Sequence, residues 1–292
     1  MSTTPTPPSA RPAAPAGSGP GASAGARGAA PVARGTAGSS RAAGGALVVE
    51  NLSFRVGGIH ILSDIDLAVR PGEMVGVIGP NGAGKTTLFN MISGVHRATA
   101  GRVLLDGADI THAPIHRRAQ AGLGRTFQTS SLFAGLSVLE NVRLAAQRRL
   151  GGNLSFLRFP RRGDQATTTA LGHLAEVDLA HRADVLAGGL SHGDKRKLEI
   201  AVLLAMEPSV ILLDEPMAGV ARADVPGLSE VIRRMHRDHA CTVLMVEHHI
   251  DVVLGLVERV AVLDQGRVLA FDEPAAIMAD PRVQSAYLGA TA

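Results

Sequence analysis

The chain has few of the residues that build disulfide frameworks, aromatic surfaces or membrane spans. Its 292 residues contain one cysteine, one tyrosine, seven phenylalanines and no tryptophan. The single cysteine, Cys241, cannot form an internal disulfide, and its place at the edge of an apolar run predicts a small buried side chain. No apolar stretch reaches the roughly 20 residues that span a bilayer. We therefore expect any membrane contact to be made through a partner.

An excess of positive charge is also missing once residues 1–45 are set aside. The whole chain has 29 Lys and Arg against 26 Asp and Glu, but residues 1–45 contain four of the arginines and no acid. Removing those four leaves 25 basic and 26 acidic residues. Binding to nucleic acid requires a dense cationic face that releases counterions from phosphates. We expect no nucleic-acid partner.

Residues 1–45 differ in composition from the rest of the chain. They consist almost entirely of Ala, Gly, Pro, Ser, Thr and Arg, and they have no aromatic residue. Such a segment cannot bury enough apolar surface to offset the entropy of ordering, so it predicts a disordered tail. It also lacks the continuous apolar core of a secretory signal. We expect the protein to remain inside the cell.

From residue 46 onward the pattern is that of an α/β protein. Alternating apolar residues over 47–54 and 59–69 predict two strands before a Pro-Gly turn. A buried strand over 74–78 leads into a glycine-rich loop and a helix over 85–93. Short aliphatic runs at 210–213, 242–246 and 260–263 alternate with helical patterns, which predicts a mainly parallel sheet with helices on both faces.

A phosphate-binding loop is the clearest motif in the chain. Gly79–Thr86 reads GPNGAGKT and matches G-x-x-x-x-G-K-[ST] between a strand and a helix. Glycines let the backbone amides approach a phosphate, the Lys85 ammonium adds positive charge, and the Thr86 hydroxyl is a ligand for Mg²⁺. The nucleotide-contacting residues predicted here are Asn81, Gly82, Ala83, Gly84, Lys85, Thr86 and Thr87.

Acidic residues and a histidine follow two other predicted strands. Asp214 and Glu215 come after the apolar run 210–213, and His248 follows the run 242–246. Ligands of open α/β sheets bind at the carboxyl ends of strands. We predict that Asp214 holds Mg²⁺, that Glu215 is the general base for an attacking water, and that His248 holds the water and Glu215 in line.

The combination of these motifs resembles the ABC ATPase family. The deciding segment is Leu190–Asp194, LSHGD, which is similar to the family signature L-S-G-G-Q. The resemblance implies a P-loop ABC cassette over residues 46–292. Its parts would be a mainly parallel core sheet, an N-terminal antiparallel β subdomain and a helical subdomain at about 129–190. It further implies that Ser191 and Gly193 complete the ATP site of a second cassette, and that Gln128 senses Mg²⁺ and the attacking water.

Two positions depart from the family pattern. The aromatic residue that stacks on adenine is replaced by Val56, although Phe54 lies two residues earlier on the same strand face. The segment after Asp-Glu-Pro usually reads A-G-L-D or A-G-L-N, whereas here Ala221 follows Ala-Gly-Val. Adenine stacking and communication between two paired sites are the properties that these replacements affect.

Within the family, several stretches resemble the ATP-binding subunits of branched-chain amino-acid importers. They are GLGRTFQTSSLF, LENVRLAA, FLRFPRR, LSHGDKRKLEIA and VQSAYLG. The resemblance implies a subunit peripheral to the inner face of the cell membrane. Its partners would be integral-membrane permease subunits, a second ATP-binding subunit and, indirectly, an extracytoplasmic solute-binding protein. Import of urea or short amides, and export of lipid or lipopolysaccharide, remain alternatives.

Overall fold

The computed structural model describes residues 44–126, 131–150 and 164–288, with Leu288 described by its backbone alone. Contacts divide the chain into residues 1–39 and 40–292, and the first of these units lies outside the described residues. Most of the predicted tail, Gln128 and the FLRFPRR segment also lie outside them. The architecture below is that of the second unit.

An antiparallel sheet forms the first part of the described chain, with strand order β2-β1-β4-β5. Its β1–β2 hairpin turns at Gly57 and Gly58, which both have positive φ angles of 54° and 86°. Such angles are accessible to glycine at little cost. The strands are β1 (Leu47–Val56), β2 (Ile59–Val69), β4 (Ala100–Leu105) and β5 (Ala108–Asp109).

A second sheet of six strands has the order β10-β9-β3-β8-β7-β6. The pairs are parallel except for the antiparallel hairpin of β9 and β10 at one edge. The predicted mainly parallel sheet is therefore confirmed. Its strands are β3 (Met74–Ile78), β6 (Leu123–Arg125), β7 (Val210–Asp214), β8 (Thr242–Val246), β9 (Arg259–Asp264) and β10 (Arg267–Asp272).

Helices connect most of these strands, and α1 begins and ends where the sequence predicted. Gly94 ends α1 with a left-handed φ of 85°. Ser191 accepts a hydrogen bond from Asp194 N and caps α5, which starts at His192. The helices are α1 (Lys85–Ser93), α2 (Ile115–Gln120), α3 (Val138–Arg149), α4 (Gln165–Glu176), α5 (His192–Leu204), α6 (Val225–His239), α7 (Ile250–Leu254), α8 (Pro274–Ala279) and α9 (Pro281–Leu288).

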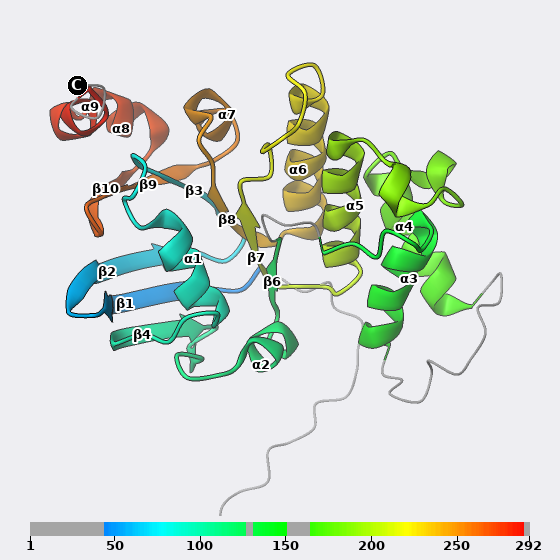
Figure 1. Cartoon of the computed structure of the whole chain (residues 1–292), viewed down its shortest axis with the longest axis horizontal. Coiled ribbons are helices and arrows are strands. Elements are labelled where there is room, and N and C mark those ends of the chain that lie inside the picture. Colours follow the sequence, from blue (N-terminus) through cyan, green and yellow to red (C-terminus); the bar gives the residue numbers. More distant parts are fainter. Residues whose placement is uncertain (1–43, 127–130, 151–163, 289–292) are drawn as a thin grey trace, which may run out of the picture. The chain divides into compact units, whose positions relative to one another are not determined.

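Alternation along the parallel strands divides the core into two apolar clusters. In β7, Ile211 and Leu213 pack with α5 and α6, while Val210 and Leu212 face α1 and the antiparallel sheet. Helix α1 therefore lies between the two sheets, whereas α5 and α6 cover the other face of the six-stranded sheet (Figure 1). Cys241 is buried, as its position predicted.

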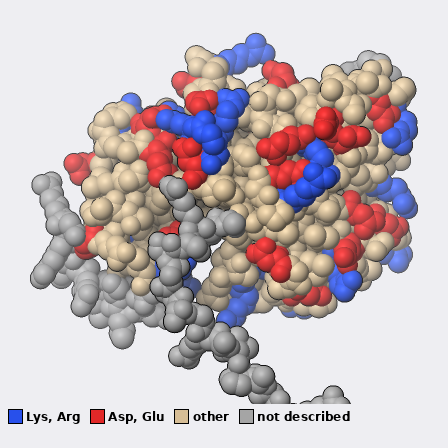
Figure 2. Space-filling model, turned by 180° about the vertical axis from the view of Figure 1, so that it is seen from behind, with Lys and Arg blue, Asp and Glu red and all other residues tan. Residues whose placement is uncertain are grey.

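Helices α3, α4 and α5 pack together beside the sheet, and a backbone bridge joins Ser137 to Leu186. Within the described residues, no helix is long and apolar enough to cross a membrane. Basic and acidic side chains lie next to one another over the face that Figure 2 shows.

Candidate nucleotide site

The glycine-rich loop between β3 and α1 has a backbone that only glycine accommodates. Gly79 has a φ of 153°, and a Cβ there would lie 2.1 Å from the carbonyl oxygen of Leu263. At Gly84, φ is 101° and a Cβ would lie 2.5 Å from Leu62 Cδ2. The loop can therefore pass close to β9 and β2 and present its amides at the start of α1.

The ammonium group of Lys85 is held by the loop itself. Nζ donates hydrogen bonds to the carbonyl oxygens of Gly79 at 2.7 Å and Pro80 at 3.0 Å. Burial lowers the pKa of Lys85 below its usual value, and the nearby charge of Glu215 counteracts part of that effect. The Lys85 ammonium therefore lies beside the loop amides, where it can bind an anion.

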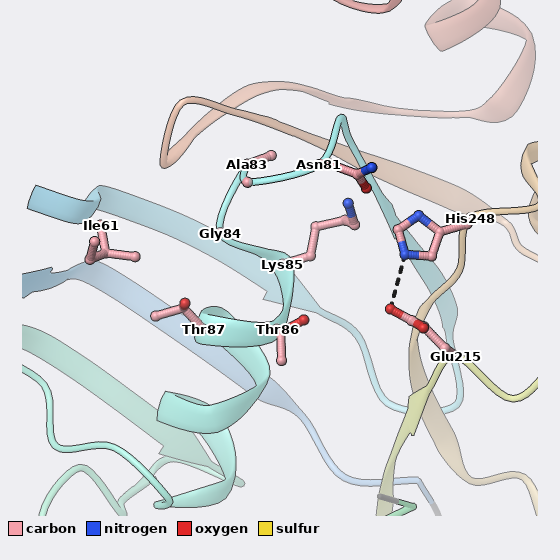
Figure 3. A pocket seen from close by; sticks show the side chains of 10 residues that line it. Ile61, Asn81, Ala83, Gly84, Lys85, Thr86, Thr87, Glu215 and His248 are labelled. Carbon is pink, nitrogen blue, oxygen red and sulfur yellow. Dashed lines mark hydrogen bonds and ion pairs between the residues drawn. The ribbon is translucent and has the colours of Figure 1, made fainter. Parts of the chain in front are cut away.

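A pocket of about 370 Å³ opens over this loop. The Lys85 side chain extends from the start of α1 toward His248, and Glu215 lies next to His248 on the far side from α1 (Figure 3). All seven loop residues predicted to contact nucleotide line the pocket, together with two of the predicted catalytic residues. The lining consists of Ile61, Asn81, Gly82, Ala83, Gly84, Lys85, Thr86, Thr87, Glu215 and His248.

Glu215 and His248 form a pair across two strand ends. His248 Nε2 lies 3.0 Å from Glu215 Oε1 (Figure 3). Glu215 has a left-handed φ of 49°, an uncommon conformation for a residue other than glycine. Its amide donates to the carbonyl oxygen of Val246, which fixes the turn after β7 against the end of β8.

The carboxylate of Glu247 joins the turn after β7 to the turn after β8. The sequence analysis assigned no role to this residue. It is 2% exposed and accepts hydrogen bonds from the amides of Met217 at 2.6 Å and His248 at 3.0 Å. The signal in the sequence is an acid between an apolar strand and a predicted site histidine. Glu247 therefore positions the backbone that carries His248.

Asp214 lies beneath the pocket and is not part of its lining. It is 1% exposed, and its Oδ2 accepts a hydrogen bond from Arg125 Nη2 at 2.7 Å. Among the described residues, its Oδ1 has no hydrogen-bond partner. An unpartnered carboxylate oxygen and the Thr86 hydroxyl are the hard oxygen donors that suit Mg²⁺. The residues therefore fit the expected ion, although the Arg125 cation beside Asp214 was not predicted.

The signature residues lie outside the lining of this pocket. Ser191 caps α5, and the position where a Gly193 Cβ would be lies 3.5 Å from Asp224 and 3.7 Å from Val220. The signature thus packs against the turn that follows β7, within its own chain. The role of Ser191 and Gly193 at the ATP site of a second cassette stays a prediction.

The neighbourhood expected to contact adenine is formed by β1 and β2. Val56 is 54% exposed, whereas the ring of Phe54 stacks on His96 with centroids 5.2 Å apart. Ile61 of β2 lines the pocket, and it was not singled out from the sequence. It supplies an apolar wall where the first hairpin meets the glycine-rich loop.

Comparisons with known proteins agree on one family. Residues 62–218 match the ABC transporter family, and residues 267–292 match the family described as branched-chain amino acid ATP-binding cassette transporter. The chain is 37% identical over 250 residues to the high-affinity branched-chain amino acid transport ATP-binding protein BraF of Pseudomonas aeruginosa. It is 36% identical over 248 residues to LivG of Escherichia coli K12, which has the same description. Both alignments cover 83% of this chain and 97% of the relative.

A relative with a different role is similarly close to this chain in sequence. The lipopolysaccharide export system ATP-binding protein LptB of Escherichia coli K12 is 37% identical over 243 residues, covering 83% of this chain and 97% of LptB. Among solved structures, the ADP conformation of MJ1267, an ATP-binding cassette, has a TM-score of 0.73 at 31% identity, covering 84% of this chain and 99% of that one. The dimeric cassette MJ0796 has a TM-score of 0.66 at 25% identity, covering 78% and 98%.

Proposed function

The chain belongs to the ABC transporter family as an ATP-hydrolysing, ATP-binding subunit, and we propose that it powers an importer of branched-chain amino acids. The main support is the match of residues 267–292 to the branched-chain cassette family, because this segment lies outside the general ABC match. The similarity to BraF and LivG, which are branched-chain amino acid transport ATP-binding proteins, also supports the proposal.

The pocket supports a hydrolysis mechanism in which each residue has a separate task. The amides of the glycine-rich loop and the Lys85 ammonium bind the phosphates, so Lys85 exchanges its contacts with Gly79 and Pro80 for the anion. Glu215 accepts a proton from the attacking water, and His248 holds the carboxylate in place from 3.0 Å. Thr86 and Asp214 would hold Mg²⁺, which would supply positive charge beside the phosphates.

Two copies of the cassette complete each other's sites in this proposal. Ser191 and Gly193 stand at the N-terminus of α5, where backbone amides favour an anion. They lie outside the pocket of their own chain, so a phosphate in a partner's pocket is the group that they would reach. The dimeric MJ0796 cassette gives a precedent for the assembly. Gln128, outside the described residues, is proposed to sense the metal and the water.

An exposed apolar surface on the helical region is a candidate contact for permease subunits on the inner face of the membrane. Phe133 and Leu186 are 61% and 56% exposed, and Leu136 and Val185 are also open to solvent. Backbone hydrogen bonds from Ala187 N to Leu136 O and from Val138 N to Val185 O hold the two segments side by side. Contiguous exposed apolar residues mark interaction surfaces in soluble domains.

Reconstitution tests the proposed substrate. The chain would be expressed with the membrane subunits that copurify with it and the corresponding solute-binding protein, and ATP-dependent uptake of labelled leucine, isoleucine and valine would be measured in vesicles. Urea and acetamide serve as competing solutes. Uptake of branched-chain amino acids that Glu215→Gln abolishes supports the proposal, whereas transport of urea or amides alone contradicts it.

Export of lipid or lipopolysaccharide is the second candidate, favoured by the similarity to LptB. The identity of the copurifying membrane subunits separates the two functions. Copurification of export-type subunits, together with ATP turnover that requires no solute-binding protein, would contradict the import proposal and support export. The docking surface is tested in the same preparation: Phe133→Ser with Leu186→Ser should reduce copurification of the membrane subunits, while Leu171→Ser, exposed on α4, should not.

A further inference from the structure

A cluster of two histidines and a glutamate lies where α4 meets α6, outside the lining of the nucleotide pocket. His173 and Glu176 are three residues apart on α4 and therefore share one face of that helix. His239 is the last residue of α6. One ligand atom from each of the three side chains can be chosen so that all lie within 4.8 Å of one another.

We propose that His173, Glu176 and His239 form a binding site for a divalent transition metal of the Zn²⁺ class that joins α4 to α6. Two imidazoles and a carboxylate are a common ligand set for Zn²⁺, with water or another ligand in the fourth position. Imidazole ligands also suit Cu²⁺ and Ni²⁺, and the proposed ligand set contains no thiolate. This site is separate from the proposed transport function and depends on none of its residues.

Two of the three ligand spacings are close to those that coordination requires, and the two histidine nitrogens lie within 4.8 Å of each other. Ligands at about 2.0–2.2 Å from a tetrahedral metal lie about 3.3–3.6 Å from one another. His173 Nδ1 is 3.4 Å from Glu176 Oε2, which already meets this spacing. His239 Nε2 is 2.7 Å from the same oxygen, so that pair would separate by about 0.7 Å when an ion replaces the hydrogen bond.

The surroundings of the His173, Glu176 and His239 cluster leave room for an ion. A hollow of about 90 Å³ is lined by Glu176, His239 and Asp238 among others. Asp238 pairs with the neighbouring Arg237, so we do not include it among the ligands. Metal binding requires a deprotonated carboxylate and neutral imidazoles, so an ion at this cluster would compete with protons for all three side chains.

An ion at this position would connect two parts of the chain that are far apart in sequence. The α4 helix belongs to the group packed beside the sheet, while α6 covers a face of the sheet itself. Arg234 of α6 also binds Asp178, just after α4, at 2.6 Å. The metal would therefore add a stronger link at a contact that already carries an ion pair.

Zinc binding by the tag-free full chain, without nucleotide, tests the proposal. Equilibrium dialysis against Zn²⁺ followed by metal analysis would give the number of ions bound. We expect one bound ion fewer in His173→Ala with His239→Ala than in the wild type, with affinity at the site reduced by more than the ~10–100-fold that loss of an outer-shell partner costs. His112→Ala, an exposed histidine elsewhere, should bind as the wild type does.

Two further measurements prevent misfolding from imitating this result. Glu176→Gln preserves the size of the side chain and removes its charge, so it should also lose the ion while circular dichroism and ATP binding stay unchanged. Co²⁺ should give the visible absorption of a four-coordinate site in the wild type alone. Equal zinc binding by the wild type and the cluster variants, or no zinc bound by either, would show that the three side chains are only hydrogen-bonded to one another.

Discussion

Arg125 and Asp214 face each other in a buried ion pair, with Arg125 Nη2 2.7 Å from Asp214 Oδ2. Their side chains are 6% and 1% exposed. Arg125 also donates to Asn90 Oδ1 and Ser93 Oγ on α1. One guanidinium thus connects the helix that follows the phosphate loop to the carboxylate at the end of β7.

Replacing Arg125 should destabilise the protein strongly. Arg125→Met leaves the Asp214 carboxylate buried without its cation, which costs roughly 3–5 kcal/mol of unfolding free energy. The exposed pair of Arg102 and Glu50 provides the control, since Arg102→Met should cost at most about 1 kcal/mol. Urea unfolding of both variants measures the difference. Equal losses would mean that the buried pair contributes no more than a surface pair.

Lys85→Ala should abolish high-affinity ATP binding. Among the described residues that line the nucleotide pocket, Lys85 supplies the one ammonium or guanidinium group, and the substitution removes it. Lys197→Ala, which removes a lysine of α5 outside that lining, should bind ATP normally. Titration with a fluorescent ATP analogue compares the two. Wild-type affinity in Lys85→Ala would remove this residue from its proposed role.

Glu215→Gln should retain ATP and lose its hydrolysis. The amide preserves the shape of the side chain but cannot accept the proton of the attacking water, so we expect turnover to fall by roughly 10²–10⁴-fold. Two cassettes joined by unhydrolysed ATP should then accumulate as a dimer. Phosphate release and light scattering, with and without Mg²⁺, measure the two effects. Turnover at the wild-type rate would exclude Glu215 as the general base.

Arg118→Met should lower stability by removing a cap on α1. Arg118 is 2% exposed and donates to the carbonyl oxygens of Met91 and Ile92 at the end of that helix, and to those of Ala113 and Thr111. Each carbonyl left unsatisfied costs about 1–3 kcal/mol. The adjacent exposed Arg117 supplies the control, Arg117→Met. Thermal unfolding should show a large decrease for the first variant and little change for the second.

Because of the contact between Glu73 and Arg259, the free energy of unfolding should decrease at acid pH. Burial opposes ionisation of Glu73, yet hydrogen bonds from Arg259 and the Arg70 amide lower its pKa below the usual 4.5. The stabilisation is complete above the unfolded-state pKa and is lost as pH falls through the lower folded-state value.

Glu73→Gln should therefore remove part of the stability at neutral pH and flatten its decrease in acid. Unfolding free energies between pH 3 and pH 7 measure this dependence. Glu230→Gln, at the exposed pair with Arg233, removes a glutamate without affecting the Arg259 contact. An unchanged acid profile in Glu73→Gln would contradict the prediction.

Local signals in the sequence were sufficient for most elements but not for their arrangement. Short β-branched runs identified β3, β7, β8 and β9 within one or two residues, and Gly94 identified the end of α1. The order of the strands could not be read in the same way, because β3 pairs with strands more than 160 residues away.

The residues of the candidate site also divide into those that could be named from the sequence and those that could not. Residues with a motif of their own, such as Lys85 and Glu215, were named from the sequence and lie around one pocket, although their roles stay predictions. Glu247, Arg118 and Arg125 could not be identified, because their importance comes from backbone and carboxylate groups that only the folded chain brings to them. Gln128 stays a prediction, since it lies outside the described residues.

The position of β3 in the sheet has a consequence for synthesis of the chain. Both neighbours of β3, namely β8 and β9, come from residues 242–264, so each of its edges stays without its partner until the ribosome has passed that region. Nascent chains with unpaired strand edges are prone to aggregate. The nucleotide pocket, which His248 helps to line, can therefore be completed only after residue 248 has been synthesised, and a shorter fragment should lack the pair of Glu215 and His248.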